Sequence, residues 1–305
     1  MELTSVEIRR AVQAALTEDL GSGDVTTLAT VPASAKSVAL LRAREPLVVA
    51  GIEFAEIAFR EVAENYYRRD EFKKMWSRGS LPPLAKIRIE KITRDGRCVQ
   101  AGETLLKISG SARAILSAER VSLNFVQRLS GVATATAQFV AAVKGTRARI
   151  LDTRKTTPGW RRFEKYAVAC GGGKNHRVGL FDMVLIKDNH LVALQNEKPN
   201  AIAAAVLRAR QKFSKLKVEV EADTLEQVTQ AAAAGADIIL LDNMTLAQLR
   251  QAVKIVHGPA KTEASGGVNL KTVRAIAQTG VDFISVGGIT HSARAVDIGL
   301  DFQDE

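Results

Sequence analysis

The second half of the chain repeats one pattern, a short apolar run that ends in charged, polar or glycine residues. The runs are ILDTRK at 150–155, VLIKDNH at 184–190, VEVEAD at 218–223, IILLDN at 238–243, KTEASGG at 261–267 and FISVGG at 283–288. Continuous β-branched and leucine runs of this length are typical of strands buried on both faces of a parallel sheet. Each interval between the later runs can hold one helix and two short loops. The pattern therefore predicts an α/β barrel whose polar residues meet at the carboxyl ends of the strands.

The first half of the chain predicts a separate domain. Residues 4–19 have the apolar stripe of an amphipathic helix, which begins at a capping box formed by Thr4 and Glu7. Residues 36–110 mix strand-like runs with one helix near 52–65. This mixture indicates an α+β domain with a largely antiparallel sheet.

Two further stretches affect the domain organisation. Residues 113–142 predict a long helical stretch with a candidate break at Ser130-Gly131. Residues 66–83 are rich in charge and end in two prolines, so we expect an exposed helix or an insertion, to which we assign no function. The length of 305 residues suits one large or two modest domains.

Composition narrows the class of protein. With 46% hydrophobic and 25% charged residues, the chain has the composition of an ordinary soluble globular protein. Its two cysteines, Cys98 and Cys170, match no zinc-binding spacing, and we interpret them as reduced thiols. No apolar stretch approaches the ~20 residues that span a bilayer, and the first residues lack the pattern of a signal peptide. We therefore expect a cytoplasmic protein with no membrane partner.

The net charge of +10 is compatible with two kinds of ligand, nucleic acid and small polyanions. The basic residues are scattered in short pairs, and only 5% of residues are aromatic, too few for an obvious base-stacking surface. Several of the cations instead follow the predicted strands. We expect a concave site for small anions and no nucleic acid, and a basic nucleic-acid-binding protein remains the alternative from another class.

Cations gather at the ends of the early runs. Arg154 and Lys155 are adjacent at the end of the first run, and the arginine fork suits carboxylates and phosphates. Lys187 ends the second run, where burial of an unpaired ammonium would be costly. The alternative for the Arg154-Lys155 pair is a solvated basic loop. Because these positions share one predicted edge, they favour an anion site.

Between these cations lies the segment CGGGKNHR at 170–177, which contains His176 and Arg177. A run of glycines lets backbone N–H groups approach an anion closely. Taken alone, the segment would be interpreted as a flexible loop. Its place between two basic strand ends favours a part in ligand binding.

Carboxylates and glycines end the later runs. Glu221 and Asp242 could balance the nearby cations, or hold a hard cation such as Mg²⁺ together with the hydroxyls of a sugar. The glycine loops at 264–268 and 285–289 are either tight βα turns or a phosphate site built from backbone amides. The chain has no GxGxxG motif after a strand, no P-loop, no GxSxG and no HExxH, so the corresponding enzyme classes have no support.

These motifs resemble those of the quinolinate phosphoribosyltransferase family, and the resemblance runs from about residue 16 to 302. The longest matching segments are EDLGSGDVTT at 18–27, ERVSLNFVQRLSGVAT at 119–134, ILDTRKTTPGWR at 150–161 and EKYAVACGGGKNHRVGLFDMVLIKDNH at 164–190. The family fold, the type II phosphoribosyltransferase fold, implies two α/β domains. Residues 1–118 would form an N-terminal α/β sandwich, with the tail at 290–305 packed on it, and residues 119–289 an incomplete, open TIM-like α/β barrel.

The resemblance also implies a reaction. It joins phosphoribosyl diphosphate to quinolinate and yields nicotinate mononucleotide, diphosphate and CO₂, a step of de novo NAD biosynthesis. It further implies Mg²⁺ as cofactor and a homodimer, or a higher oligomer built from it, in which the partner's N-terminal domain covers each active site. A paralogue of the same fold with another acceptor, such as the molybdenum-transport-associated relatives, is the nearest alternative.

Finally, the resemblance assigns roles to residues of this chain. The quinolinate-binding set is Arg120 of the partner subunit, Thr153, Arg154, Lys155, His176, Arg177 and Lys187. The set for phosphoribosyl diphosphate is Lys155, Lys187, Glu221, Asp242, Ser265, Gly266, Gly267, Gly287 and Gly288. Lys155, Lys187, Glu221 and Asp242 would be catalytic. Glu221 and Asp242 would also hold Mg²⁺, directly or through water.

Overall fold

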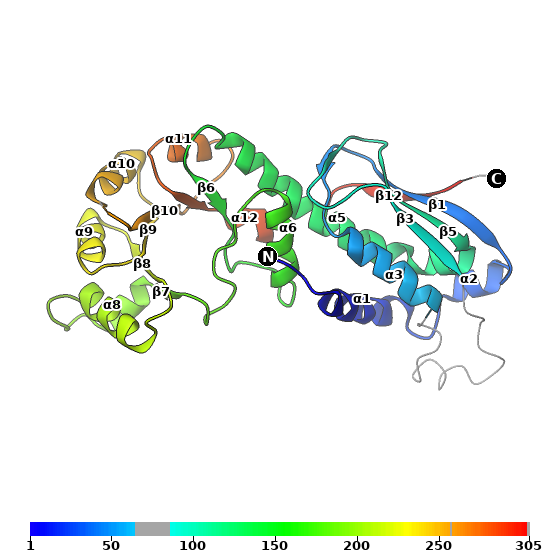
Figure 1. Cartoon of the computed structure of the whole chain (residues 1–305), viewed down its shortest axis with the longest axis horizontal. Coiled ribbons are helices and arrows are strands. Elements are labelled where there is room, and N and C mark those ends of the chain that lie inside the picture. The colour runs from blue at the N-terminus through cyan, green and yellow to red at the C-terminus, as the bar shows by residue number, and fades with distance from the viewer. Residues whose placement is uncertain (65–85, 257, 304–305) are drawn as a thin grey trace. The chain divides into compact units, whose positions relative to one another are not determined.

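The computed structural model describes residues 1–64, 86–256 and 258–303, and it divides into two compact units (Figure 1). The first unit comprises Met1–Thr134 and Ala293–Glu305, and the second comprises Ala135–Ser292. The charged stretch predicted at 66–83 lies outside the described residues. No helix in the described part of the chain is long and apolar enough to cross a bilayer.

The first unit is built on an antiparallel sheet of four strands in the order β12-β1-β5-β3. Its strands are β1 (Lys36–Ala43), β3 (Ile87–Lys91), β5 (Thr104–Ser111) and β12 (Ile298–Gln303), with a small separate pair, β2 (Leu47–Val48) and β4 (Cys98–Val99). Its helices are α1 (Ser5–Leu20), α2 (Val25–Thr30), α3 (Ile52–Glu64) and the first part of α5 (Ala112–Ala142). The predicted capping box is confirmed, since the Thr4 hydroxyl accepts from the Glu7 amide at 3.2 Å and the Glu7 carboxylate from the Thr4 amide at 2.9 Å.

The last residues of the chain return to this first unit. Strand β12 pairs antiparallel with β1, which places Ile298 opposite Ala43. Beside this pairing, Arg294 forms an ion pair with Glu45, and the Asp297 amide donates to the same carboxylate at 2.8 Å. Residues from the two ends of the chain thus complete one sheet.

The helix predicted to break at Ser130-Gly131 is continuous, so that prediction was wrong. Gly131 is a site of close approach instead, because a Cβ there would lie 2.0 Å from the Arg294 carbonyl oxygen. The Ser130 and Thr134 hydroxyls accept from the backbone amides of Ala50 and Val48, both at 2.9 Å. These bonds hold the helix to the first unit as far as Thr134. The division between the units therefore falls inside α5, later than the predicted boundary between residues 118 and 119.

The second unit carries a parallel sheet of six strands in the order β6-β11-β10-β9-β8-β7. They are β6 (Arg149–Leu151), β7 (Val184–Ile186), β8 (Val218–Ala222), β9 (Ile238–Asp242), β10 (Lys261–Ser265) and β11 (Phe283–Ser285), one for each apolar run. Strands β6 and β7 remain edge strands among the described residues, so the barrel is open. The predicted fold class is confirmed.

Helices connect the strands and cover the outside of the sheet, where α8 to α11 form an outer arc (Figure 1). The helices of this unit are α6 (Arg161–Cys170), α7 (Asp188–Val192), α8 (Ala201–Lys212), α9 (Leu225–Ala233), α10 (Leu246–Ile255), α11 (Val273–Ala277) and α12 (Gly288–His291). Capping boxes at Thr224 and Thr245 begin α9 and α10 directly after β8 and β9. The short loops before these helices place the residues that follow each strand at one edge of the sheet.

Candidate active site

One cavity of about 790 Å³ lies at the carboxyl ends of the six parallel strands. Its lining includes every predicted site residue of the barrel: Thr153, Arg154, Lys155, His176, Arg177, Lys187, Glu221, Asp242, Ser265, Gly266, Gly267, Gly287 and Gly288. Arg120, the remaining predicted residue, is exposed on α5 and belongs to the first unit. The topology of the second unit thus brings together the residues predicted at its strand ends.

The middle of the cavity pairs a cation with an acid. The Lys187 ammonium forms an ion pair with the carboxylate of Glu221, which is largely buried, while Lys187 is about half exposed. Asp242 ends the next strand, and its carboxylate accepts from the Asn243 side-chain amide at 2.7 Å. Glu221 and Asp242 are not part of the one cluster of three metal-ligating groups found among the described residues. Any cation held by this pair would therefore need oxygen ligands from a substrate or from water.

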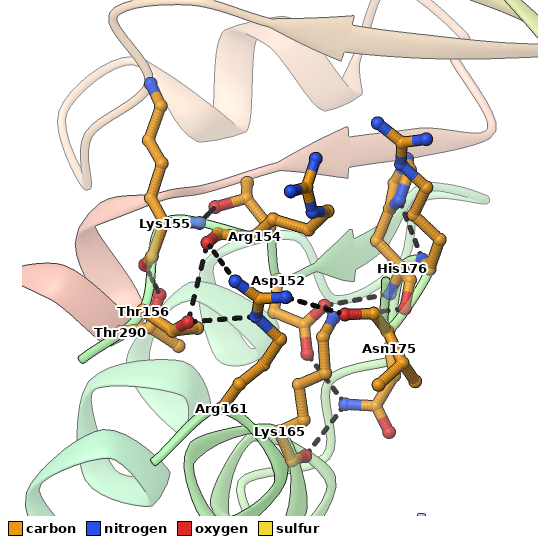
Figure 2. Close-up of polar contacts among 12 residues, drawn as sticks. Asp152, Arg154, Lys155, Thr156, Arg161, Lys165, Asn175, His176 and Thr290 are labelled. Carbon is orange, nitrogen blue, oxygen red and sulfur yellow. Dashed lines mark hydrogen bonds and ion pairs between the residues drawn. The ribbon is translucent and has the colours of Figure 1, made fainter. Parts of the chain in front are cut away.

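A fully buried ion pair lies behind the cationic side of the cavity (Figure 2). The ammonium of Lys165, on α6, contacts the carboxylate of Asp152 and donates to the His176 carbonyl oxygen at 3.0 Å. Asp152 also accepts from the Asn175 side-chain amide at 2.7 Å and from the His176 backbone amide at 2.8 Å. Burial is the largest influence on both groups, and it disfavours their charged forms. It raises the pKa of Asp152 and lowers the pKa of Lys165, although the attraction between the two charges opposes both shifts. The ion pair fixes the segment that carries His176 and Arg177.

A second set of bonds holds the loop that carries Arg154 and Lys155. The Arg161 guanidinium donates to the Thr156 hydroxyl at 3.1 Å and to the Arg154 carbonyl at 3.4 Å, and the Thr290 hydroxyl donates to the Lys155 carbonyl at 2.7 Å (Figure 2). The Arg154 side chain, in contrast, has a hydrogen-bond donor without an acceptor, because its Nε is buried and has no partner. A buried unpaired donor in a cavity is a place where a ligand oxygen can bind.

His176 faces two carboxylates that the sequence analysis missed. Its Nε2 lies 3.0 Å from an oxygen of Glu219 and 3.7 Å from an oxygen of Glu263, and both glutamates are fully buried. Burial and the neighbouring Glu219 raise the pKa of Glu263 to about 8. Burial opposes the charged form of His176, but the hydrogen bond to Glu219 and the charges of both glutamates outweigh it and raise the pKa of His176. The charged residues inside the buried runs VEVEA and KTEAS were the available signal in the sequence.

The glycine loops follow β10 and β11. Gly266 has φ 94° and Gly267 has φ 60°, conformations that favour glycine. A Cβ on Gly266 would lie 2.1 Å from the Asn243 side-chain oxygen, whereas one on Gly267 would meet nothing within 4 Å. The loop therefore packs closely on the residue that follows Asp242, and its backbone lines the cavity. Exposed backbone amides of this kind can bind phosphate.

Comparisons with known proteins identify the family of the chain. The model for the C-terminal domain of quinolinate phosphoribosyl transferase matches residues 132–301, and the model for its N-terminal domain matches residues 24–130. The carboxylating nicotinate-nucleotide pyrophosphorylase of Mycobacterium leprae is 42% identical over 96% of both chains. The chloroplastic Arabidopsis thaliana enzyme of that name is 40% identical over 98% of this chain and 84% of its own length.

Solved structures give the same result. The nicotinate-nucleotide pyrophosphorylase of Francisella tularensis superposes with a TM-score of 0.86 at 37% identity, over 99% of this chain and 98% of its own. NadC from Streptococcus pyogenes superposes with a TM-score of 0.86 at 36% identity over the full length of both chains. The two family domains meet near residue 131, close to the structural division after Thr134. On both sequence and structure, the chain belongs to the quinolinate phosphoribosyltransferase family.

Proposed function

We propose that this protein transfers the phosphoribosyl group of phosphoribosyl diphosphate to quinolinate and releases diphosphate, CO₂ and nicotinate mononucleotide, a precursor of NAD. The observation that carries the proposal is the division of one cavity into three parts. Cations line the ends of the early strands, carboxylates the middle strands and glycine loops the late strands. The proposal agrees with the names of relatives that are 40–42% identical over nearly the whole chain.

The cationic part fits an aromatic dicarboxylate. Arg154 has a buried Nε without an acceptor, and a carboxylate is the acceptor that a guanidinium binds best. Arg177 lines the same part of the cavity, where burial and the nearby Arg154 lower its pKa. An anion bound between the two guanidinium groups would give the Arg154 Nε an acceptor and would offset the repulsion between the two positive charges. We assign the carboxylates of quinolinate to this place, with Thr153 and His176 beside them.

The middle of the cavity fits the transfer step. As diphosphate leaves, positive charge develops on the ribose carbon, and the carboxylates of Glu221 and Asp242 can stabilise it. Lys155 and Lys187 would hold the leaving diphosphate. Because Lys187 pairs with Glu221, a diphosphate that attracts Lys187 would also release the Glu221 charge to the ribose. The alkylated pyridine nitrogen then stabilises the electron pair left on the ring carbon as its bond to the 2-carboxylate breaks. CO₂ leaves, and that carbon takes up one proton to give nicotinate mononucleotide.

The carboxylates of Glu221 and Asp242 also fit a magnesium ion. Mg²⁺ in proteins is commonly bound by one or two carboxylates together with the phosphates of a substrate. No third acidic or histidine side chain of the described chain joins this pair, which suits an ion that arrives with phosphoribosyl diphosphate. Such an ion would supply positive charge to the leaving diphosphate.

We further infer a homodimer with shared active sites, in which Arg120 of the partner subunit completes the quinolinate side. Arg120 is exposed on α5 of the first unit, so its guanidinium is accessible to a second chain. We also infer a cytoplasmic location, although the related plant enzymes are named chloroplastic or mitochondrial.

One assay tests the reaction. The purified protein, with Mg²⁺ and phosphoribosyl diphosphate, is offered either quinolinate or nicotinate, and CO₂ and the mononucleotide are followed. We expect turnover with quinolinate alone and a loss of activity on chelation of Mg²⁺. No turnover with quinolinate, or equal turnover with nicotinate, contradicts the proposal. Turnover of a different acceptor would indicate a paralogue.

A complementation experiment tests the shared site. Arg120→Ala and Lys187→Ala chains, each nearly inactive, are unfolded together and refolded as a mixture. Half of the dimers are then heterodimers with one intact site of two, so activity should recover to about a quarter of the wild-type value. Chains refolded separately and then mixed are the control. If subunits exchange and no activity returns, the site is not shared.

A further inference from the structure

Two fully buried glutamates adjoin His176 and have no part in the reaction as proposed above. Glu219, on β8, and Glu263, on β10, lie 3.0 Å and 3.7 Å from the His176 Nε2. Among the described residues, the side-chain partners of these carboxylates are His176 and, for Glu263, Ser285, and no oxygen of either carboxylate has a hydrogen bond of good geometry. Burying carboxylates with so few partners is costly, so their place beside His176, with Glu263 itself part of the cavity lining, calls for an explanation.

The Arg177 backbone amide determines which nitrogen of His176 carries the proton. This amide donates to the His176 Nδ1 at 2.7 Å, so Nδ1 presents its lone pair. The proton of the neutral ring therefore lies on Nε2 and faces Glu219. The backbone of His176 is held as well, by Asp152 and Lys165. Both ring nitrogens and both backbone polar atoms of His176 thus have protein partners.

This tautomer also decides between a proton and a metal ion at the cluster. One ligand atom from each of His176, Glu219 and Glu263 lies within 4.8 Å of the others, a spacing that a divalent cation could bridge. A metal would need the lone pair of Nε2, and the proton would then have to move to Nδ1. The Arg177 amide already occupies Nδ1 as a donor. The geometry therefore favours a hydrogen bond from Nε2 to Glu219 over a metal site.

We infer that Glu219 and Glu263 are positioning residues, which hold the His176 ring so that it braces the backbone of Arg177 on the quinolinate side of the cavity. The inference rests on the proposed function for the identity of the ligand. Glu219, at the shorter distance, is the nearer acceptor for the Nε2 proton, and Glu263 approaches the same nitrogen from a different strand. Arg177 is tethered a second time, because its guanidinium donates to the Met183 carbonyl at 3.3 Å. The contact between His176 and the Arg177 backbone therefore fixes the position at which the Arg177 guanidinium can bind an anion.

The tautomer can be measured without any turnover. The full-length protein has four histidines, and nitrogen-15 labelling of histidine resolves the two ring nitrogens of each by NMR. The His176 signals are those lost in His176→Gln. At alkaline pH, above the raised pKa of His176, where the ring is neutral, we expect an unprotonated Nδ1 and a protonated Nε2, unchanged when Zn²⁺ is added. A protonated Nδ1, or a Zn²⁺-induced shift of Nε2, would overturn the inference and indicate a metal site.

Kinetics test the consequence. Glu219→Leu removes the acceptor, and we expect the KM for quinolinate to rise about tenfold, with the KM for phosphoribosyl diphosphate changed less than about twofold. Glu219→Gln retains an acceptor, so it should keep the tautomer and change this KM less, and it serves as well if the leucine variant does not fold. Glu61→Gln, an equally buried glutamate of the first unit, is the matched control.

The possible failures are distinguishable. If Glu219→Leu leaves the KM for quinolinate unchanged, Glu219 does not position His176 and the inference fails. If the wild-type protein does not use quinolinate at all, the proposed function fails, while the NMR measurement still decides how the ring is held.

Discussion

Replacing Lys165 with methionine tests how the buried ion pair supports the active-site loop. Methionine keeps most of the lysine stem, so the change removes the ammonium with little loss of packing. The ammonium contacts Asp152 and donates to the His176 carbonyl at 3.0 Å, and neither side chain of the pair is exposed. The variant therefore leaves a buried carboxylate without its counter-charge.

The size of the effect follows from the partners that remain. Removing one member of a buried ion pair costs about 3–5 kcal/mol. Asp152 keeps two donors, the Asn175 side-chain amide at 2.7 Å and the His176 amide at 2.8 Å, so we expect the lower end, about 3 kcal/mol.

The loss of stability in Lys165→Met should also depend on pH, because Asp152 can take up a proton. Burial raises the pKa of Asp152 above its ordinary value of 3.8, and the charge of Lys165 opposes this rise. In the variant, the pKa of folded Asp152 therefore lies further above the pKa of the unfolded chain. Such a group stabilises the fold below the unfolded pKa, and that stability is lost as pH rises through the folded pKa. The destabilisation should thus be larger at about pH 8 than at about pH 5.

Chemical denaturation at both pH values, followed by circular dichroism, measures these effects. A double-mutant cycle with Asp152→Asn isolates the interaction, because the double variant buries no unpaired charge and should be more stable than Lys165→Met alone. Lys254→Met, an exposed lysine of α10 in the same unit, is the control and should change stability by less than about 0.5 kcal/mol. A coupling below about 1 kcal/mol, or a loss that does not grow with pH, would refute the reasoning.

Three other perturbations have definite outcomes. Arg154→Ala should raise the KM for quinolinate by about 10- to 100-fold and leave that for phosphoribosyl diphosphate nearly unchanged; equal effects on both in steady-state kinetics would remove it from the quinolinate side. Gly266→Ala should raise the KM for phosphoribosyl diphosphate far more than Gly267→Ala, because only the first Cβ overlaps a neighbour; similar values would contradict this. The hydrogen bond from Arg294 lowers the pKa of Glu45 to about 2, below its ordinary 4.5. Arg294→Ala should therefore reduce stability in thermal unfolding above pH 4.5, and the difference from wild type should fade as pH drops to about 2; a difference that persists there would be unexpected.

The outer part of the candidate site could be predicted from the sequence because position alone determines it. An apolar run buried on both faces is a parallel strand, and the residues after parallel strands meet at one edge. Lys155, Lys187, Glu221 and Asp242 could therefore be grouped before any contact was known, although they span most of the barrel. Their roles, the magnesium ion and the dimer remain predictions.

Features that depend on distant partners were harder to predict. Gly131 was interpreted as a helix break because glycine is a poor helix former, whereas the structure needs the missing Cβ for the backbone of Arg294. The pairing of β12 with β1 likewise joins segments near opposite ends of the chain. Nothing local to either segment specifies these contacts, so composition and periodicity could not place the division inside α5.

The inner part of the site was missed for a related reason. Lys165 and Glu219 carry charge within amphipathic or apolar runs, where a charged residue is normally interpreted as solvent-facing. Both are fully buried because each has a partner from another element, the opposite charge of Asp152 for Lys165 and the ring N–H of His176 for Glu219. A buried charge is tolerated only with such a partner, so its presence depends on the pair rather than on the residue. The consequence for this family is that a charge inside a barrel strand marks a residue to test, because here such charges hold the segment on which substrate binding is proposed to depend.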